Sequence, residues 1–188
     1  MTKVAVTSRS FSRHPVLRAA LLERYDNVTF NDDGKKITGA DLLAYLDGHD
    51  KAITALEIID HALLQALPGL KVISKYGVGY DMVDLDAMVD HSVRLGWTGG
   101  VNKRSVSELV ISMAVALLRH VPIANGEMRT GTFRQHVGRQ LSDCTIGIVG
   151  CGHVGKDLAK LLRAFGCRVL ANDILDFPEI ISNSLSTI

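Results

Sequence analysis

Short apolar runs alternate with amphipathic segments along the first half of the chain. The runs fall at residues 4–7, 28–30, 52–56, 71–74 and 93–97. Because they lack strict polar alternation, they are typical of short strands buried on both faces of a parallel sheet. One helix is expected to start at Pro15, and Thr38 is expected to cap another. Two more helices are expected over residues 59–67 and 85–89. The pattern predicts an α/β fold with a doubly wound parallel sheet, flavodoxin-like in scale.

The second half begins with a glycine-rich break at residues 98–102 and continues into a long helix at 105–120. Apolar residues cover most of the circumference of this helix, so we expect it to be buried between domains or against another subunit. Pro122 is expected to end the helix. We therefore expect a flavodoxin-like domain at residues 1–98 and a second domain at 99–188.

A cluster of glycines with the spacing G-x-G-x-x-G follows an apolar run at residues 145–149. Gly150 would allow the tight turn out of the strand, and Gly152 would let the backbone approach a pyrophosphate. Gly155 would let the following helix pack closely on the strand. The phosphates would then meet the free N–H groups and the positive end of the helix dipole. The cluster predicts a dinucleotide-binding turn.

The residues after the cluster support this interpretation. Apolar side chains recur at helical spacing at Val154, Leu158, Leu161, Leu162 and Phe165. Gly166 sits where a helix often ends, and a second apolar run at 168–171 leads to Asp173. Asp173 lies eighteen residues after Gly155, near the interval expected for an acid that binds the adenosine ribose. No Arg or Lys follows at 174–176, which favours NAD over NADP. The alternative is an ordinary βαβ turn with an incidental surface aspartate.

A second glycine loop, Lys75-Tyr76-Gly77-Val78-Gly79, follows the strand expected at 71–74. Its two glycines allow a sharp turn, so that successive N–H groups can point at one anion. The carboxyl ends of parallel strands are also where α/β sheets bind ligands. A plain strand-to-helix connection accounts equally well for these residues.

Charge and composition exclude several classes of protein. The net charge over 188 residues is +1, which creates no broad field for nucleic acid or an acidic membrane. No apolar stretch has the length of a signal-peptide core or a membrane span. The three cysteines lack zinc-type spacing and indicate reduced thiols in the cytoplasm. The seven histidines are scattered and form no catalytic or metal-binding pattern.

Three segments together resemble the D-isomer-specific 2-hydroxyacid dehydrogenases, particularly their phosphoglycerate dehydrogenase branch. They are VISKYGVGYDMVDLDA at 72–87, NKRSVSELVISMAVALLR at 102–119 and TIGIVGCGHVGKDLAKLLRAFGCRVLAND at 145–173. The local motifs match the family, and so do the order and spacing of the three segments. The resemblance implies two domains, one flavodoxin-like and one a Rossmann NAD-binding domain, with an active-site cleft between them. It covers nearly the whole chain up to about Asp173.

The resemblance also implies roles for individual residues. The expected cofactor-binding residues are Val78, Gly150, Gly152, His153, Val154, Gly155 and Asp173. The expected substrate-binding residues are Lys75, Tyr76, Gly77, Val78 and Gly79. In relatives the backbone of the second loop holds the substrate carboxylate and touches the nicotinamide end, while His153 and Val154 would lie beside the pyrophosphate. The helix at 105–119 would lie at the domain junction and, in many relatives, at a dimer interface.

The chain departs from the family at several positions. Lys75 stands where the family has Arg, Tyr76 where it usually has a small residue, and Gly99 where it usually has Pro. The catalytic Arg, Glu and His of the family come from the second half of the nucleotide domain, beyond the last residue, Ile188. After Asp176 the sequence FPEIISNSLSTI no longer resembles the family. We expect it to be the product of a premature stop or a change of frame, and we identify no catalytic residue in this chain.

The functional expectation is an NAD-dependent D-2-hydroxyacid dehydrogenase that interconverts a 2-hydroxy acid and a 2-oxo acid by hydride transfer. In such an enzyme a His–Glu pair handles the proton and an Arg orients the carboxylate, so this truncated chain is expected to be inactive. The alternative is a non-catalytic NAD-binding or dimerising remnant that acts as an interaction module. A flavodoxin-like FMN protein is disfavoured, because no Ser/Thr-rich phosphate loop follows the first strand. A homodimer is expected, with no partner among nucleic acids or membranes.

Overall fold

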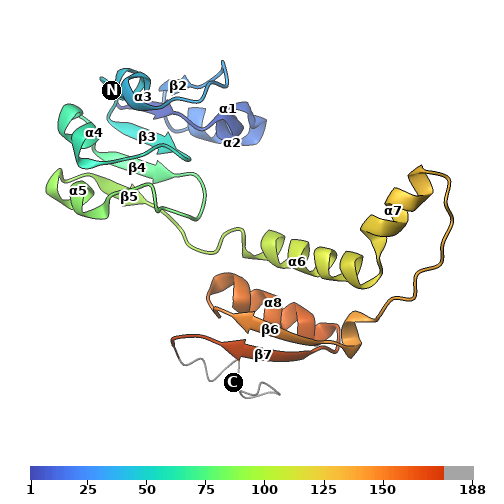
Figure 1. Cartoon of the computed structure of the whole chain (residues 1–188). Helices are drawn as coiled ribbons and strands as arrows, with labels where there is room; N and C mark the ends of the chain where they lie inside the picture. The colour runs from blue at the N-terminus through green and yellow to red at the C-terminus, as the bar shows by residue number, and fades with distance from the viewer. Residues whose placement is uncertain (176–188) are drawn as a thin grey trace. The chain divides into compact units, whose positions relative to one another are not determined.

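The structure is a computed structural model that describes residues 1–175. The chain forms two compact units, Met1–Thr98 and a second that begins at Gly99 (Figure 1). Each unit has its own cluster of buried apolar side chains. The expectation of a foreign tail after Asp176 lies outside the described residues.

The first unit is built on a five-stranded sheet in which every neighbouring pair is parallel. Its strands are β1 (Lys3–Val6), β2 (Asn27–Phe30), β3 (Lys51–Thr54), β4 (Val72–Lys75) and β5 (Arg94–Gly96). The order across the sheet is β2-β1-β3-β4-β5. The doubly wound parallel sheet predicted from the apolar runs is therefore confirmed.

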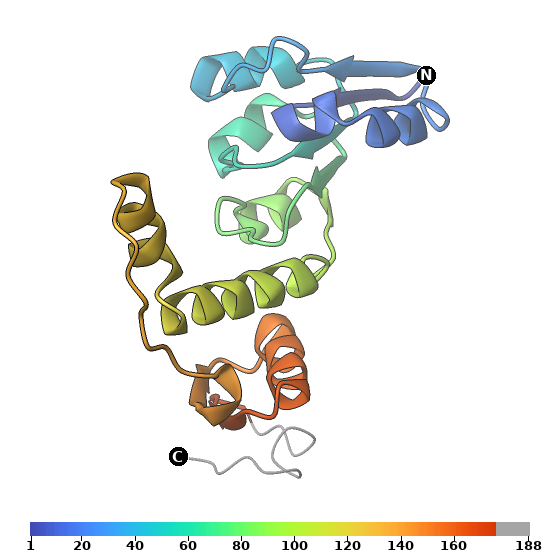
Figure 2. The same cartoon turned by 90° about the vertical axis from the view of Figure 1, so that its right-hand side faces the viewer.

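Helices cover both faces of this sheet. They are α1 (Arg9–Arg13), α2 (Pro15–Leu22), α3 (Gly39–Leu46), α4 (His61–Ala66) and α5 (Leu85–Asp90). The views in Figures 1 and 2 place α3, α4 and α5 along one face, and α1 and α2 near β1 and β2 on the other. This distribution is what alternating strands and helices produce when the strands stay parallel.

The core of the first unit lies under α3, α4 and α5. Ala5, Ala52 and Ile73 are opposite one another on β1, β3 and β4, and all three are fully buried. Leu46 from α3 and Leu64 from α4 pack in the same cluster. Small residues on the two central strands let the helices approach the sheet closely, and the larger leucines fill the space between layers.

Two helix starts differ from the sequence-based expectation. Thr38 occupies the N-cap position of α3, but its side chain accepts no capping hydrogen bond. The helix expected at 59–67 begins only at His61, where the Asp60 side chain accepts from the Leu63 N–H at 2.9 Å. Ile59 instead forms a parallel bridge with Val83 and is fully buried. The bridge gives the Ile59 backbone groups hydrogen-bond partners. At the start of a helix these groups would have been left unsatisfied.

The second unit combines helices with a small parallel sheet. Its elements are α6 (Lys103–Leu118), α7 (Val121–Arg129), a 3₁₀ turn (Leu141–Asp143), β6 (Thr145–Val149), α8 (His153–Ala164) and β7 (Arg168–Asn172). In the described part of the chain β6 pairs only with β7, in parallel. Helix α6 lies against α8, and its Ile111, Ala114 and Leu118 pack on the cluster formed with this sheet.

Pro122 does not have the role expected of it. Helix α6 ends before His120. The left-handed backbone conformation of His120 (φ 56°) changes the direction of the chain. Pro122 then lies in the first turn of α7, where its missing N–H needs no partner. The proline therefore starts a new helix, bent by 61° from α6.

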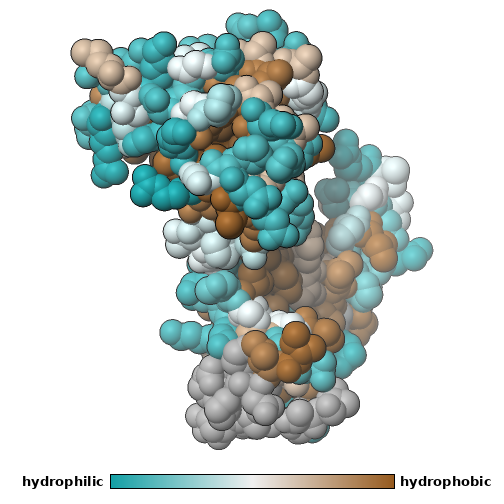
Figure 3. Space-filling model, turned by 90° about the vertical axis from the view of Figure 1, so that its left-hand side faces the viewer, coloured by the Kyte–Doolittle hydropathy of each residue, from teal (hydrophilic) through white to brown (hydrophobic). Residues whose placement is uncertain are grey.

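Within the second unit α6 is buried on one face only, and its burial between domains or against another subunit stays a prediction. Ser107 is its only buried residue, and Leu109, Met113 and Leu117 are 53%, 57% and 68% exposed. Figure 3 shows hydrophobic surface gathered over this helix. One face packs on α8, and the unit offers too few other elements to cover the remainder.

Within residues 1–175, no single helix is long and apolar enough to cross a membrane; α6 and α7 meet that test only as a bent pair, by length and composition.

Replacing Ile73 with alanine is expected to lower the free energy of unfolding of the first unit by about 2–5 kcal/mol, because it leaves a cavity under α4. Trp97, the single tryptophan, lies in this unit, so its fluorescence during urea unfolding reports on it. The control Leu56→Ala truncates a side chain that is 75% exposed and should change the value by no more than about 0.5 kcal/mol. Equal effects would contradict the packing described.

Candidate functional site

The G-x-G-x-x-G loop joins β6 to α8 in the second unit. Gly150 has φ +92°, a conformation that favours glycine. A Cβ atom on Gly155 would lie 2.2 Å from the Gly150 carbonyl oxygen. Any side chain at Gly155 would therefore push the first turn of α8 away from the strand. These two glycines are required by the backbone geometry alone, whatever the loop binds.

Gly152 has a different environment. It is the N-cap of α8, no side chain accepts a capping hydrogen bond there, and a Cβ on it would meet nothing within 4 Å. The first N–H groups of α8 thus lack a side-chain cap, and the space in front of Gly152 is open. An uncapped helix start beside open space suits an anion. The neighbouring Cys151 is 2% exposed, and burial raises the pKa of its thiol, with the Asp173 carboxylate adding to the effect.

Asp173 lies beside the same loop, just after β7. One carboxylate oxygen accepts a hydrogen bond from the Cys151 N–H, and the other accepts from the Leu175 N–H at 3.0 Å. These hydrogen bonds, the Cys151 one first, lower the pKa of the Asp173 carboxyl. Each oxygen keeps a lone pair for a further donor. The carboxylate is therefore held, charged at neutral pH, at the edge of the glycine loop.

His153 begins α8 and packs on a glycine that sequence reasoning did not assign to the site. A Cβ atom on Gly100 would lie 2.5 Å from His153 Cγ. Helix α6 is tied to the same turn, because Ser107 Oγ donates to the Val154 carbonyl at 3.4 Å and Arg104 pairs with Asp157 at 2.9 Å. The only sequence signal was the glycine pair after Thr98, which was interpreted as a break between the two halves of the chain. The structure makes Gly100 and α6 a support for the loop.

The second glycine loop follows β4 in the first unit and is fastened at both ends. The Tyr76 N–H donates to the Thr54 carbonyl at 2.7 Å, and the Trp97 indole N–H donates to the Val78 carbonyl at 2.8 Å. Gly77 has φ +131°. Within residues 1–175, no protein acceptor is recorded for the N–H groups of Gly77, Val78 and Gly79. Their free donors leave this loop able to bind an anion.

Lys75 and Tyr76 point toward the neighbouring loops of the same sheet edge. The Lys75 ammonium donates to the Ala55 carbonyl after β3, and burial lowers its pKa, opposed by the nearby Glu57 carboxylate. The Tyr76 ring meets the Phe11 ring of α1 edge-on, with centroids 5.3 Å apart. The loops that follow β1, β3 and β4 are therefore in contact with one another.

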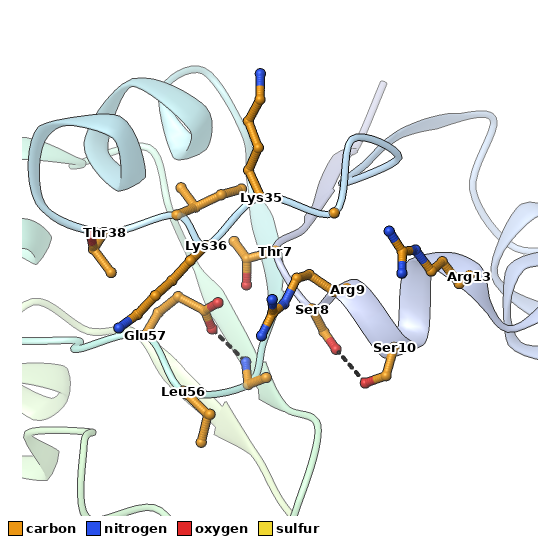
Figure 4. Close-up of a pocket in the computed structure, with 13 residues that line it drawn as sticks. Thr7, Ser8, Arg9, Ser10, Arg13, Lys35, Lys36, Thr38, Leu56 and Glu57 are labelled. Atoms are coloured by element: carbon orange, nitrogen blue, oxygen red, sulfur yellow. Dashed lines mark hydrogen bonds between the residues drawn. The ribbon is translucent and has the colours of Figure 1, made fainter.

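A cavity that the sequence did not indicate opens beside these loops. It has a volume of about 680 Å³ and is lined by residues that follow β1, β2 and β3, among them Arg9, Arg13 and Lys36 (Figure 4). These cations are distant from one another in the sequence, so no local motif announces the cavity. Parallel strands bring them to one edge.

One histidine–carboxylate pair occurs in the described part of the chain. His136 Nε2 lies 2.6 Å from Glu127 Oε2, and Arg134 lies 3.6 Å from the same carboxylate. These contacts tie the extended segment at 133–136 back onto α7, and Figure 1 shows that segment running alongside the end of α7. We assign the pair a structural role, because neither glycine loop contributes to it.

Relatives in sequence include two enzymes of known name. D-3-phosphoglycerate dehydrogenase of Rattus norvegicus is 32% identical over 120 residues, which cover 63% of this chain and 22% of that protein. Glyoxylate reductase of Thermococcus litoralis is 27% identical over 169 residues, covering 85% of this chain and 51% of that protein. The chain thus spans between about a fifth and a half of the length of these relatives.

Solved structures share the fold. D-lactate dehydrogenase from Aquifex aeolicus, complexed with NAD and lactic acid, matches with a TM-score of 0.80 at 19% identity, covering 100% of this chain and 56% of that one. The apo-structure of D-lactate dehydrogenase from Escherichia coli matches with a TM-score of 0.79 at 20% identity, covering 100% and 60%.

The family model for the D-isomer specific 2-hydroxyacid dehydrogenase catalytic domain matches residues 4–182. That match takes in the sheet of the first unit, the helix α6 and both glycine loops. The resemblance found in three segments of the sequence is confirmed, and the chain belongs to the D-isomer specific 2-hydroxyacid dehydrogenase family.

Proposed function

We propose that this chain is part of an NAD-dependent dehydrogenase that transfers a hydride between NAD and a 2-hydroxy acid, as an oxidoreductase acting on CH–OH groups. Residues 1–98 would be its substrate domain, and residues 99–188 its linking helix and part of its NAD-binding domain. The observation that carries the proposal is the uncapped start of α8 at Gly152, which faces open space and has the Asp173 carboxylate beside it on the Cys151 N–H.

The cofactor would bind at this loop through backbone and carboxylate groups. The pyrophosphate would accept hydrogen bonds from the uncapped N–H groups at Gly152, His153 and Val154. The ribose hydroxyls of the adenosine would donate to the free lone pairs of Asp173. Ile174 and Leu175 offer no cation for a 2′-phosphate, which supports NAD rather than NADP.

The substrate would bind at the second loop. Its carboxylate would meet the N–H groups of Gly77, Val78 and Gly79, with Val78 also touching the nicotinamide end. Lys75 and Tyr76 would form the wall of the site toward β3 and α1, where their contacts hold them. The bound nicotinamide supplies the hydride acceptor, while this chain's residues orient the acid against it.

The 188-residue polypeptide by itself is proposed to be inactive. The acid–base pair that relatives use has no counterpart among the described residues near either loop, and the described nucleotide sheet has two strands. The second candidate function, a non-catalytic NAD-binding or dimerising module, is favoured by the exposed apolar face of α6. A cytoplasmic location belongs to the proposal, in keeping with three free cysteines.

NAD is expected to bind weakly, with a Kd of about 1 mM or above, and Asp173→Ala should weaken it a further tenfold or so by removing a charged acceptor. Amide shifts of Cys151, Gly152 and His153 in a ¹⁵N NMR titration measure the affinity. Asp143→Ala, which removes an exposed carboxylate of the same unit, is the matched control. Equal affinities for the two variants would argue against the ribose contact.

The purified polypeptide is expected to oxidise no NADH with any 2-oxo acid, because hydride transfer needs a proton donor within about 3–3.5 Å of the reacting centre. Loss of NADH absorbance is the measurement, with D-lactate dehydrogenase and pyruvate as the positive control. Turnover that disappears in Asp173→Ala would show that the 188 residues already contain a working site and would reject the non-catalytic alternative.

The chain is expected to form a homodimer through α6, because its exposed Leu109, Met113 and Leu117 make an apolar surface that water disfavours. Sedimentation at tens of micromolar protein should give dimers. A dissociation constant in that range corresponds to a free energy of association of about −6 to −7 kcal/mol. Met113→Lys with Leu117→Lys should give monomers, whereas Val89→Lys, at a 76% exposed position of the first unit, should not. A monomeric unsubstituted chain would contradict the proposal.

A further inference from the structure

Two of the three cysteines stand opposite each other at the starts of β6 and β7. Thr145 pairs with Arg168 in the parallel register of these strands, so the residues just before them, Cys144 and Cys167, are neighbours. Figure 1 shows both strands starting beside the 3₁₀ turn. Neighbouring strands lie about 4.8 Å apart, and the Cα atoms of a disulfide are usually about 4.4–6.8 Å apart. The backbone therefore holds these two residues at a separation that a disulfide can span.

Hydrogen bonds bring the two thiols to the same turn of backbone. The Leu141 carbonyl accepts from the Cys167 thiol at 3.2 Å and also from the Cys144 N–H at 3.0 Å. The Cys144 thiol donates to the Gln140 carbonyl at 3.4 Å. The two sulfur atoms thus lie against consecutive carbonyl groups of one short turn.

Both side chains project from the same face of the small sheet. Ile146 and Val169 are opposite each other in the register and belong to the apolar cluster that includes α8. Because side chains alternate along a strand, Cys144 shares the face of Ile146, and Cys167 shares the face of Val169. No rotation of either strand is needed to join the two sulfur atoms.

The two thiols differ in their exposure. Cys167 is 7% exposed, whereas Cys144 is partly exposed. Burial raises the pKa of the Cys167 thiol, and the nearby Cys144 adds to the effect. A protonated thiol reacts slowly, so the pair should stay reduced until an oxidant is present in excess. An oxidant from solution reaches Cys144 first.

We propose that Cys144 and Cys167 are a redox modification site, at which a hydroperoxide converts the two thiols into a reversible disulfide. The Cys144 thiolate attacks one peroxide oxygen, the O–O bond breaks, and a sulfenic acid forms with release of water. The Cys167 thiolate then attacks the Cys144 sulfur, and the S–O bond breaks with release of a second water. Two thiols and one hydrogen peroxide give one disulfide and two waters; the sulfurs lose two electrons and the peroxide oxygens gain them.

The disulfide would stabilise the second unit without touching its glycine loop. It would lie at the starts of β6 and β7, whereas Gly150 and Asp173 follow the ends of these strands. Within residues 1–175, β6 pairs with β7 alone, so a covalent link that closes the chain through α8 restrains the unfolded state of a sheet with few other contacts. The inference does not depend on the proposed function.

The reduced 188-residue protein is treated with a small molar excess of hydrogen peroxide, with no NAD present. The product is expected to weigh less by two hydrogen atoms, to run as a single chain without reductant, and to give one peptide that joins Cys144 to Cys167. Thiols counted after denaturation should fall from three to one, and dithiothreitol should restore them. The amide signals of β6 and β7 should persist to a temperature roughly 10 °C higher after oxidation.

Single substitutions separate this pair from the third cysteine. Cys144→Ser and Cys167→Ser should each abolish the cross-link, whereas Cys151→Ser, which removes another buried thiol, should form it as the unsubstituted chain does. The amide spectrum of each reduced variant shows whether it is folded. If Cys167→Ser does not fold, Cys144→Ser, at a partly exposed position, still decides the matter.

Three results would overturn the proposal. The first is a cross-link between two chains or to Cys151. The second is oxidation of Cys144 to a sulfinic acid while Cys167 remains a free thiol. The third is the same loss of two thiols in Cys144→Ser as in the unsubstituted chain. Failure to bind NAD, with the disulfide formed as expected, would count against the proposed function alone.

Discussion

Parallel pairing of short strands is the constraint on which both glycine loops depend. Since parallel strands all end at the same edge, the segments after β1, β3 and β4 must gather there, whatever their sequences. In the first unit this brings Phe11 to Tyr76 and Lys75 to the Ala55 carbonyl. In the second unit the same geometry brings Asp173, after β7, to the Cys151 N–H, after β6. The chemistry of the chain is therefore concentrated at strand ends.

The G-x-G-x-x-G loop is held from two sides within the second unit. On one side Gly155 approaches the Gly150 carbonyl so closely that no Cβ atom fits. On the other side α6 packs on α8, with Ser107 on the Val154 carbonyl and Arg104 on Asp157. Helix α6 thus supports the loop with one face while its apolar opposite face remains exposed. Under the proposed function the same helix would serve both the cofactor site and an interface, because the two roles would use different faces.

Charge in the first unit is distributed unevenly around its sheet edge. The loop after β2 contains two aspartates, and both are paired with cations, Arg18 and Lys35. Figure 4 shows Lys35 directed away from the cavity. Arg9, Arg13 and Lys36 remain at its walls.

The sequence by itself determined the order of the strands, the two glycine loops and the family, because each depends on local spacing. Gly150, Gly155 and Asp173 could be assigned from their separation along the chain, and their positions beside β6 and β7 follow from one βαβ unit. The tertiary structure alone decided that Pro122 starts α7, since the left-handed His120 precedes it. It also decided that Gly100 supports His153 and that Arg9, Arg13 and Lys36 share a cavity. These contacts join residues far apart in the chain, and their geometry depends on packing that no local pattern records.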